Sequence, residues 1–212
     1  MKALIIAGTD TDVGKTVVAA MLTLALGGHY WKPIQAGTKG STDRQTVAAL
    51  TGLPEAHFSP ERYVLSAPLS PHRAAELDGV RIDLDALTPP AVPPSQRLIV
   101  EGAGGLLVPL NRECLQMELF QRWGAPVVLV ARTRLGTINH TLLSLEALHA
   151  RAMPVLGVLF VGEAMEDSER TIAAFGHVKR LGRLPFLERL NAASLAQAFR
   201  EHFALSDFEA LP

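Results

Sequence analysis

A glycine-rich segment near the start of the chain carries residue types that could hold a phosphate group. It reads GTDTDVGKT, from Gly8 to Thr16, and lies between a short apolar run and a helical pattern. In a loop that joins a strand to a helix, backbone N–H groups converge on phosphate oxygens, and the helix N-terminus favours negative charge. Lys15 would reach the β- and γ-phosphates of a nucleoside triphosphate, and the Thr16 hydroxyl would bind Mg²⁺. The segment therefore predicts a phosphate-binding loop (P-loop).

The spacing of this loop departs from the usual form. Five residues separate Gly8 from Gly14, where the common motif has four, and the glycine expected one place later is Thr9. A chance Gly-Lys-Thr is the alternative, but the strand before it, the helix after it and the terminal Lys-Thr pair argue against chance. Phosphate binding alone does not identify the reaction that follows.

A carboxylate that could bind Mg²⁺ follows a second apolar run. Glu101 comes directly after Leu98–Val100 and before Gly102–Gly105. Ligands of open α/β sheets gather at the carboxyl ends of the strands, and glycines let the backbone approach phosphates closely. Mg²⁺ prefers carboxylate oxygens together with phosphate and water. An exposed loop acid is the alternative, but a position between a buried strand and a glycine run favours a functional role.

Two further charged residues are open to more than one interpretation. Asp43 follows Ser41 and Thr42, where an N-cap or first-turn position explains an acid without any ligand. Lys32 ends His29–Trp31, a short predicted strand, so its ammonium could hold negative charge that develops beside the P-loop. A solvated surface lysine explains that residue equally well. The residues alone leave both roles open.

Alternating strand and helix patterns predict the elements that would position these residues. Short apolar runs are typical of parallel strands covered on both faces. The runs are Ala3–Ala7, Leu98–Val100, Val127–Ala131 and Val155–Val161. The helical patterns cover residues 15–27 (apolar nearly all round), 137–150 and 190–203. The sequence predicts an α/β fold with a mostly parallel central sheet and helices on both faces.

The proline-rich segment TPPAVPPS at 88–95 bears on the number of domains. Four prolines in eight residues could form an interdomain linker, but only about 90 residues precede the segment and the strand pattern resumes at once. We interpret it as a loop within a single domain that covers residues 1–212. Residues 54–80 show little periodicity and predict loops with a short helix.

The composition narrows the class of protein. Apolar residues make up 48% of the 212 residues and charged residues 19%, which indicates a globular chain. A net charge of −1 gives no long-range attraction to nucleic acid or to anionic membranes. Cys114 is the only cysteine, which excludes an internal disulfide and favours a reducing compartment. The first apolar run is too short to span a membrane, so we expect a soluble, cytoplasmic protein.

These segments together resemble the dethiobiotin synthetase family, a branch of the P-loop NTPases. The matching segments are GTDTDVGKTV (8–17), KPIQAG (32–37), the Asp43 segment, SPH (70–72), LIVEGAGGLLVPL (98–110), LGTINHTLLSLEAL (135–148) and RLPF (183–186). They follow the family's order from one end of the chain to the other. The P-loop with its additional residue and the VEGAGG run are specific, whereas SPH and RLPF are weak alone.

The resemblance implies a homodimer with active sites at its interface, and one reaction. 7,8-Diaminopelargonic acid, CO₂ and MgATP would give dethiobiotin, ADP and phosphate in the penultimate step of biotin synthesis. One substrate amine becomes a carbamate, ATP phosphorylates it to a carbamic-phosphoric anhydride, and the second amine closes the ureido ring. Such an enzyme is a cyclo-ligase, with Mg²⁺ as cofactor and ATP as co-substrate.

Matching the family's motifs residue by residue implies roles for this chain. Lys15 and Lys32 would be catalytic, because carbamate and triphosphate are both anionic and need cations to bring them together. The implied metal ligands are Thr16, Asp43 and Glu101. Besides these three and Lys15, the implied nucleotide-binding residues are Asp12, Val13, Gly14, Val17, Gly102, Ala103, Gly104, Leu184, Pro185 and Phe186. The implied substrate-binding residues are Thr11, Ala36, Gly136, Thr137, Ile138 and Asn139.

Three places qualify these assignments. Gly136–Asn139 opens a predicted helix whose free N–H groups could hold the substrate carboxylate across the dimer interface, although Thr137 could also simply cap that helix. Ala36 stands where the family usually has Ser or Thr, so a substrate hydrogen bond of about 0.5–1.5 kcal/mol would be lost. Val161 stands where many members carry an Asn that reads the adenine edge, which predicts that CTP or GTP partly replaces ATP.

Two other classes of P-loop protein compete with this interpretation. A regulatory ATPase of the cell-division or plasmid-partition type usually has an additional lysine early in the loop, where this chain has Thr9 and Asp10. A ligase with a glutaminase domain needs a nucleophilic cysteine, and Cys114 has no local signature of one.

His72, in the SPH segment, could approach the active site.

Overall fold

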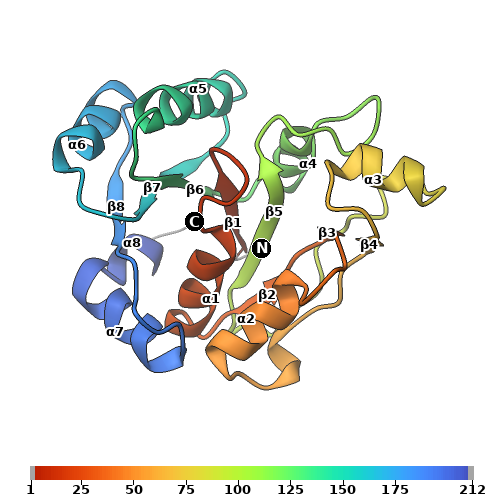
Figure 1. Ribbon diagram of the computed structural model, residues 1–212, viewed down its shortest axis with the longest axis horizontal. Coiled ribbons are helices and arrows are strands. Elements are labelled where there is room, and N and C mark those ends of the chain that lie inside the picture. Colours follow the sequence, from red (N-terminus) through yellow and green to blue (C-terminus); the bar gives the residue numbers. More distant parts are fainter. Residues whose placement is uncertain (1–2, 210–212) are drawn as a thin grey trace.

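Six parallel strands form the central sheet of the computed structural model, which describes residues 3–209 (Figure 1). The strands are β1 (Ala3–Gly8), β2 (His29–Trp31), β5 (Leu98–Gly105), β6 (Val127–Arg132), β7 (Val155–Val161) and β8 (Arg180–Leu184). Their order is β2-β5-β1-β6-β7-β8, and every neighbouring pair is parallel. The expected α/β fold with a parallel central sheet is confirmed.

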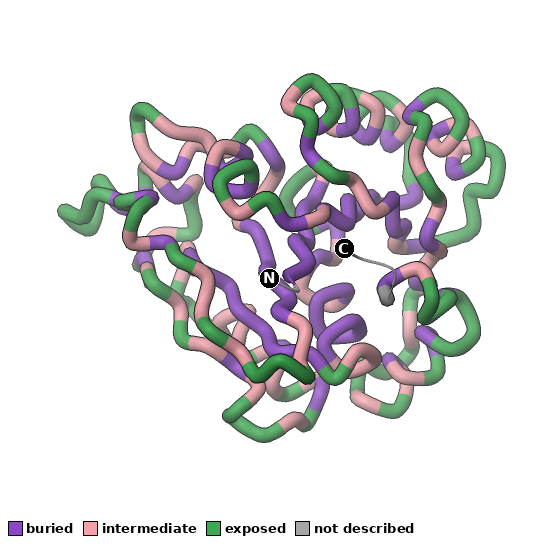
Figure 2. Tube along the Cα trace, turned by 180° about the vertical axis from the view of Figure 1, so that it is seen from behind, coloured by how far each residue is buried: buried purple, intermediate pink, exposed green. Residues whose placement is uncertain are grey.

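Helices cover both faces of this sheet. On one face lie α1 (Lys15–Ala25), α2 (Asp43–Thr51), α7 (Ala192–His202) and α8 (Ser206–Glu209); on the other lie α4 (Gln116–Trp123), α5 (Thr137–His149) and α6 (Glu166–Phe175). Successive side chains of a strand point to opposite faces, so Leu4 of β1 packs on the α1 side and Ile5 on the α5 side. Figure 2 shows the buried backbone at the centre and exposed segments outside. Among residues 3–209, no helix is both long and apolar enough to cross a bilayer.

Most predicted elements are confirmed, with shifted ends. α1 stops at Ala25, two residues early, because Gly27 with φ of 55° turns the chain toward β2. The C-terminal helix begins at Ala192, directly after its N-cap residue, instead of at Leu190. β5 is longer than predicted and runs through the glycines to Gly105, so Glu101 lies within the strand and not after it.

The chain between β2 and β5 forms a smaller layer beside the main sheet. It contains β3 (Ile34–Ala36), a 3-10 helix (Glu55–His57), β4 (Tyr63–Leu65) and α3 (Pro71–Leu77), and β3 pairs with β4 in parallel. The predicted short helix is confirmed as α3, whereas the two-stranded sheet was not expected. Residues 88–95 form neither helix nor strand, and the single-domain interpretation stays a prediction.

Gly182 in β8 faces the end of α7 too closely for a side chain. Its φ is 146°, and an added Cβ would overlap the carbonyl oxygen of His202 and lie 2.7 Å from Cδ1 of Phe203. We predict that Gly182→Ala lowers the free energy of unfolding by about 3 kcal/mol, since backbone strain and a backbone clash act together. Urea denaturation followed by circular dichroism measures the loss.

Gly79→Ala is the matched control for this prediction. Gly79 also has a left-handed backbone, with φ of 68°, but an added Cβ there would meet nothing within 4 Å. Its substitution should cost only about 1 kcal/mol. Equal losses in the two variants would contradict the idea that the contact with α7 sets the cost at Gly182.

Candidate active site

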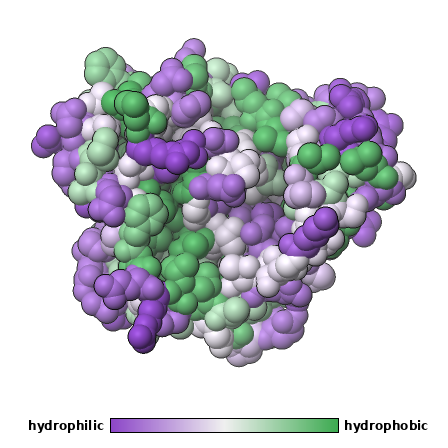
Figure 3. Space-filling model, viewed as in Figure 1, coloured by the Kyte–Doolittle hydropathy of each residue, from purple (hydrophilic) through white to green (hydrophobic). Residues whose placement is uncertain are grey.

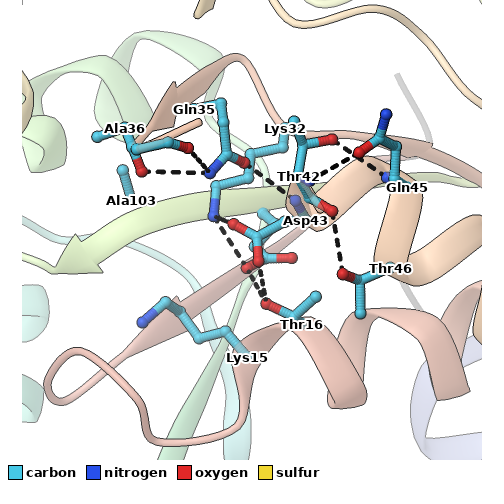
Figure 4. Close-up of polar contacts among 12 residues, drawn as sticks. Lys15, Thr16, Lys32, Gln35, Ala36, Thr42, Asp43, Gln45, Thr46 and Ala103 are labelled. Carbon is cyan, nitrogen blue, oxygen red and sulfur yellow. Dashed lines mark hydrogen bonds and ion pairs between the residues drawn. The ribbon is translucent and has the colours of Figure 1, made fainter. Parts of the chain in front are cut away.

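Charged and hydroxyl side chains from four parts of the fold converge at the carboxyl edge of the main sheet (Figure 4). They are Lys15 and Thr16 at the start of α1, Lys32 after β2, Asp43 at the start of α2, and Glu101 in β5. The sequence singled out these five residues, and the structure brings them together.

The Thr16 hydroxyl lies between two carboxylates. Its Oγ1 is 2.9 Å from Oδ1 of Asp43 and 2.9 Å from Oε1 of Glu101. A hydroxyl and two carboxylates are oxygen ligands of the kind that Mg²⁺ binds, and phosphate oxygens and water would complete its shell. Among residues 3–209, His, Cys, Asp and Glu side chains form no metal-binding group of three or more. The three residues therefore fit a magnesium site that a bound nucleotide would complete.

The Lys32 ammonium pairs with both carboxylates. Its Nζ forms an ion pair with Oδ2 of Asp43 and lies 3.3 Å from Oε1 of Glu101. Burial has the largest single effect and lowers the pKa of Lys32, but Glu101 and Asp43 together outweigh it, so the pKa is raised above 10.5. The stabilisation from this ammonium is therefore fully present below pH 10.5 and is lost only as the pH rises through the raised pKa. With 7% of its surface exposed, Lys32 is not a solvated surface lysine.

Lys15 is buried in the same cluster, but its positive charge has less compensation from nearby carboxylates than that of Lys32. Its Nζ donates to the carbonyl oxygen of Asp10 at 2.9 Å. Burial lowers the pKa of Lys15 most; the Glu101 carboxylate raises it in part, and the Lys32 ammonium lowers it further. As the pH rises, Lys15 loses its proton before Lys32. An anionic phosphate beside Lys15 would supply the missing compensation.

Tyr30 is a site residue that the sequence analysis missed. Its hydroxyl donates to Oε2 of Glu101 at 2.8 Å, and both side chains are buried. Burial and then the Glu101 carboxylate raise the pKa of Tyr30 well above its usual range, so its hydroxyl stays a donor. The available signal was strand periodicity, because the middle residue of β2 points to the face that α1 covers.

Left-handed backbone accommodates the additional residue of the P-loop. Asp12 has φ of 56° and Gly14 has φ of 97°. An added Cβ at Gly8 would lie 2.8 Å from the carbonyl oxygen of Asp10, so the loop can fold back on itself only with glycine there. Arg132 at the end of β6 pairs with the Asp10 carboxylate at 3.2 Å and ties the loop to the next strand.

Asp43 is free to join the cluster because its neighbour caps the helix. The Thr42 hydroxyl accepts from the N–H of Gln45, and the Gln45 side chain accepts from the N–H of Thr42. Asp43 is the first residue of α2, and its N–H donates to Oε1 of Gln35 at 3.1 Å. Of the two positions that the sequence left open, the first turn is confirmed and the N-cap is wrong.

A cavity of about 510 Å³ extends from the P-loop to the end of β8. The implied nucleotide-binding residues in its walls are Asp12, Val13, Gly14, Val17, Leu184, Pro185 and Phe186. Val161 also lines it, and its Cγ1 is 3.1 Å from the place of a Gly14 Cβ, so its isopropyl group lies beside the P-loop. Arg134 and Glu163 line it too, and the sequence analysis missed both. Figure 3 shows hydrophobic side chains gathered on the side of the molecule where β8 and α7 lie.

A smaller cavity of about 270 Å³ lies between the end of β5 and α5. Its walls include Thr9 of the P-loop, Leu106 and Val108 after β5, and Leu143 of α5. Most of this wall is apolar, and the sequence analysis assigned it no role.

The start of α5 differs from one expectation. Gly136 is the N-cap residue, and the Thr137 hydroxyl lies 3.5 Å from that of Thr141, so capping by the Thr137 side chain is wrong. The Thr137 N–H already donates to the carbonyl oxygen of Arg134 at 3.0 Å and is not free. Gly136–Asn139 lines neither of the two cavities. Its substrate role stays a prediction, as do those of Thr11 and Ala36.

Comparison with known proteins connects this geometry to a family. A family model described as an AAA domain matches residues 2–194. A protein of Novosphingobium aromaticivorans named ATP-dependent dethiobiotin synthetase BioD is 57% identical over 208 residues, which cover 98% of this chain and 100% of that relative. The chain belongs to the dethiobiotin synthetase family. A relative of the same name from Rhodopseudomonas palustris is 56% identical and covers 98% of this chain and 96% of its own length. The family resemblance of the motifs is confirmed.

Solved structures place this dethiobiotin synthetase family member among P-loop proteins by fold. The septum site-determining protein MinD from Pyrococcus horikoshii OT3, complexed with Mg-ADP, has a TM-score of 0.55 at 12% identity and covers 94% of this chain and 95% of its own. The cell division ATPase MinD from Pyrococcus furiosus has a TM-score of 0.55 at 14% identity, with 95% and 99% covered. At these identities the likeness concerns the fold alone.

Lys32→Met tests whether this lysine neutralises carboxylates that can also hold a metal. Without the ammonium, Glu101 remains buried beside a second carboxylate, so the free energy of unfolding should fall by about 3 kcal/mol in EDTA. Mg²⁺ between the carboxylates would replace the lost charge, so Mg²⁺ should stabilise this variant more than the wild type. Chemical denaturation with and without Mg²⁺ measures both effects.

Lys39→Met is the control for this comparison, because Lys39 is exposed. It should match the wild type in both media. The metal assignment would be contradicted if Mg²⁺ stabilised the Lys32→Met variant and the wild type equally.

Proposed function

We propose that this chain is a cyclo-ligase that converts 7,8-diaminopelargonic acid, CO₂ and ATP to dethiobiotin, ADP and phosphate, with Mg²⁺, in the penultimate step of biotin synthesis. The observation that carries the proposal is the pair of buried lysines beside the P-loop: Lys32 is ion-paired with Asp43 and Glu101, and Lys15 has no carboxylate partner of its own among residues 3–209. Membership of the dethiobiotin synthetase family supports the same reaction.

The chemistry needs cations that bring two anions together. An amine of the substrate adds to CO₂ and loses a proton, which gives the carbamate. A carbamate oxygen attacks the γ-phosphorus and ADP leaves. The second amine then attacks the carbonyl carbon and loses a proton, and phosphate leaves as the ring closes. Lys15 would bind the phosphates, and Lys32 would hold the carbamate and the charge that develops during transfer.

The metal site of the proposal consists of Thr16, Asp43 and Glu101. When bound, Mg²⁺ supplies positive charge to the phosphate oxygens during phosphoryl transfer. The residues of this chain orient the ligands: the Thr16 hydroxyl is already 2.9 Å from each carboxylate, and the Tyr30 hydroxyl fixes the other oxygen of Glu101.

The larger cavity suits the nucleoside of ATP. It continues from the P-loop, where the phosphates would bind, to Leu184–Phe186, whose side chains and backbone would contact the base. Phe186 is exposed and could cover the base from solvent. Gly102, Ala103 and Gly104 would face the phosphates from β5.

The smaller cavity suits the methylene chain of the diamine, because its walls are largely apolar. Thr11 and Ala36 would lie near the amines, and Gly136–Asn139 of a partner subunit would hold the carboxylate. Leu135, just before α5, and Leu143, on α5, are both exposed apolar side chains. Their exposure supports a homodimer through this surface. A cytoplasmic location is part of the same proposal.

The decisive experiment follows ADP and dethiobiotin together. The purified protein is incubated with MgATP and bicarbonate, with and without 7,8-diaminopelargonic acid. We expect ADP release that depends on the diamine and equals the amount of dethiobiotin. ATP hydrolysis that ignores the diamine would contradict the ligase and favour a regulatory ATPase of similar fold.

Base selectivity is a second prediction from this site. Because Val161 cannot make a paired donor–acceptor contact with adenine, we expect CTP or GTP to support ring closure at rates within about ten-fold of ATP. Rates with the four triphosphates measure this, and the Val161→Asn variant should shift the preference toward ATP. Strict dependence of the wild type on ATP would show that other groups read the base.

A further inference from the structure

The side-chain amide of Gln116 holds the glycine run of β5 from outside the sheet. Gln116 is the first residue of α4 and has 3% of its surface exposed. Its Oε1 accepts from the N–H of Ala103 at 2.6 Å, and its Nε2 donates to the carbonyl oxygen of Gly105 at 3.0 Å. Its own N–H donates to the carbonyl oxygen of Val108 at 2.8 Å. One residue thus satisfies three backbone groups along and after the glycine run.

The glycine run needs such a partner because it leaves the regular ladder. The pairing of β5 with β2 ends at Val100. On the other side, Ile6 lies opposite Glu101 and Gly8 opposite Gly105, so three residues of β5 face one residue of β1. A bulge of this kind leaves backbone groups without ladder partners, and buried groups must find others. The Gln116 amide takes the place of a neighbouring strand.

The close approach of α4 to this bulge depends on glycine. An added Cβ at Gly102 would lie 2.7 Å from Cζ of Phe120 and 3.1 Å from Nε2 of Gln116. Gly104 has φ of 70°, and its Cβ position is 3.5 Å from Oγ1 of Thr11 in the P-loop. The bulge therefore has α4 on one side and the P-loop on the other.

We infer that Gln116 is a positioning residue for nucleotide binding. Its amide fixes the bulge of Gly102–Gly105 in the shape that presents this backbone to the phosphates and keeps Glu101 directed at the metal site. Gln116 touches no reacting group and acts through Ala103 and Gly105. The inference rests on the nucleotide site of the proposed function.

Gln116→Met tests the inference, because methionine has a similar length and volume but no strong hydrogen-bonding group. We expect the Kd for Mg-ADP, measured by titration calorimetry, to rise about ten-fold, which corresponds to about 1.4 kcal/mol. The KM for ATP should rise by a similar factor while kcat changes less, since Lys15 and Lys32 are untouched. Gln121→Met is the matched control, because Gln121 is exposed on the same helix, and it should leave both constants unchanged.

A second variant covers the case in which Gln116→Met does not fold. Gln116→Asn keeps the amide but is one methylene too short to reach both backbone groups, so its Kd should rise in the same direction. A purely structural role would lower the active fraction and kcat with Kd and KM unchanged, and that result would overturn the inference. If the wild type binds Mg-ADP but makes no dethiobiotin, the proposed reaction fails, while the comparison of Kd values still decides the role of Gln116.

Discussion

One buried carboxylate constrains most of the site. Glu101 has 1% of its surface exposed, and an ionised carboxylate in such a place is stable only with paired charge and hydrogen bonds. Its partners come from two other parts of the chain: the Tyr30 hydroxyl and the Lys32 ammonium in and directly after β2, and the Thr16 hydroxyl in α1. All three are within reach only if β2 lies beside β5 and α1 begins at the same edge. The charge on Glu101 and the order of the strands therefore depend on each other.

The balance of charge around Thr16 couples metal binding to the lysines. Lys32 is ion-paired with both carboxylates, whereas Lys15 has only the carbonyl oxygen of Asp10 and a lowered pKa. A phosphate bound beside Lys15 would therefore pair with an ammonium that has no carboxylate partner in the described part of the chain. A divalent ion would compete with the Lys32 ammonium for the oxygens of Asp43 and Glu101, because both cations neutralise the same two carboxylates. Metal binding would thus free the Lys32 ammonium for an anionic substrate.

Local patterns were sufficient to predict the parallel sheet, the P-loop with Lys15 and Thr16, and a role for Glu101. They left Lys32 and Asp43 open, and only the family resemblance pointed to these two residues. They were insufficient for contacts made by folding alone: Thr16 and Glu101 are 85 positions apart, and Tyr30 and Glu101 are 71 apart. The glycines after Glu101 indicated a loop, because glycine disfavours strands. In the structure β1 and the Gln116 amide hold them as a bulged continuation of β5, so tertiary context overrode local preference.

A second buried carboxylate is connected through an arginine to the wall of the larger cavity. Glu169 of α6 has no exposed surface, and Arg183 of β8 pairs with it at 3.1 Å while donating to the carbonyl oxygen of Gly162 at 3.4 Å. Gly162 lines the larger cavity, so this pair fixes the β7–α6 loop against β8. Glu101 beside the P-loop and Glu169 behind the wall of the larger cavity are thus both buried carboxylates that need their cationic partners. The fold shared with distant P-loop proteins supplies the edge of the sheet, and these two buried charges determine how that edge is shaped in this chain.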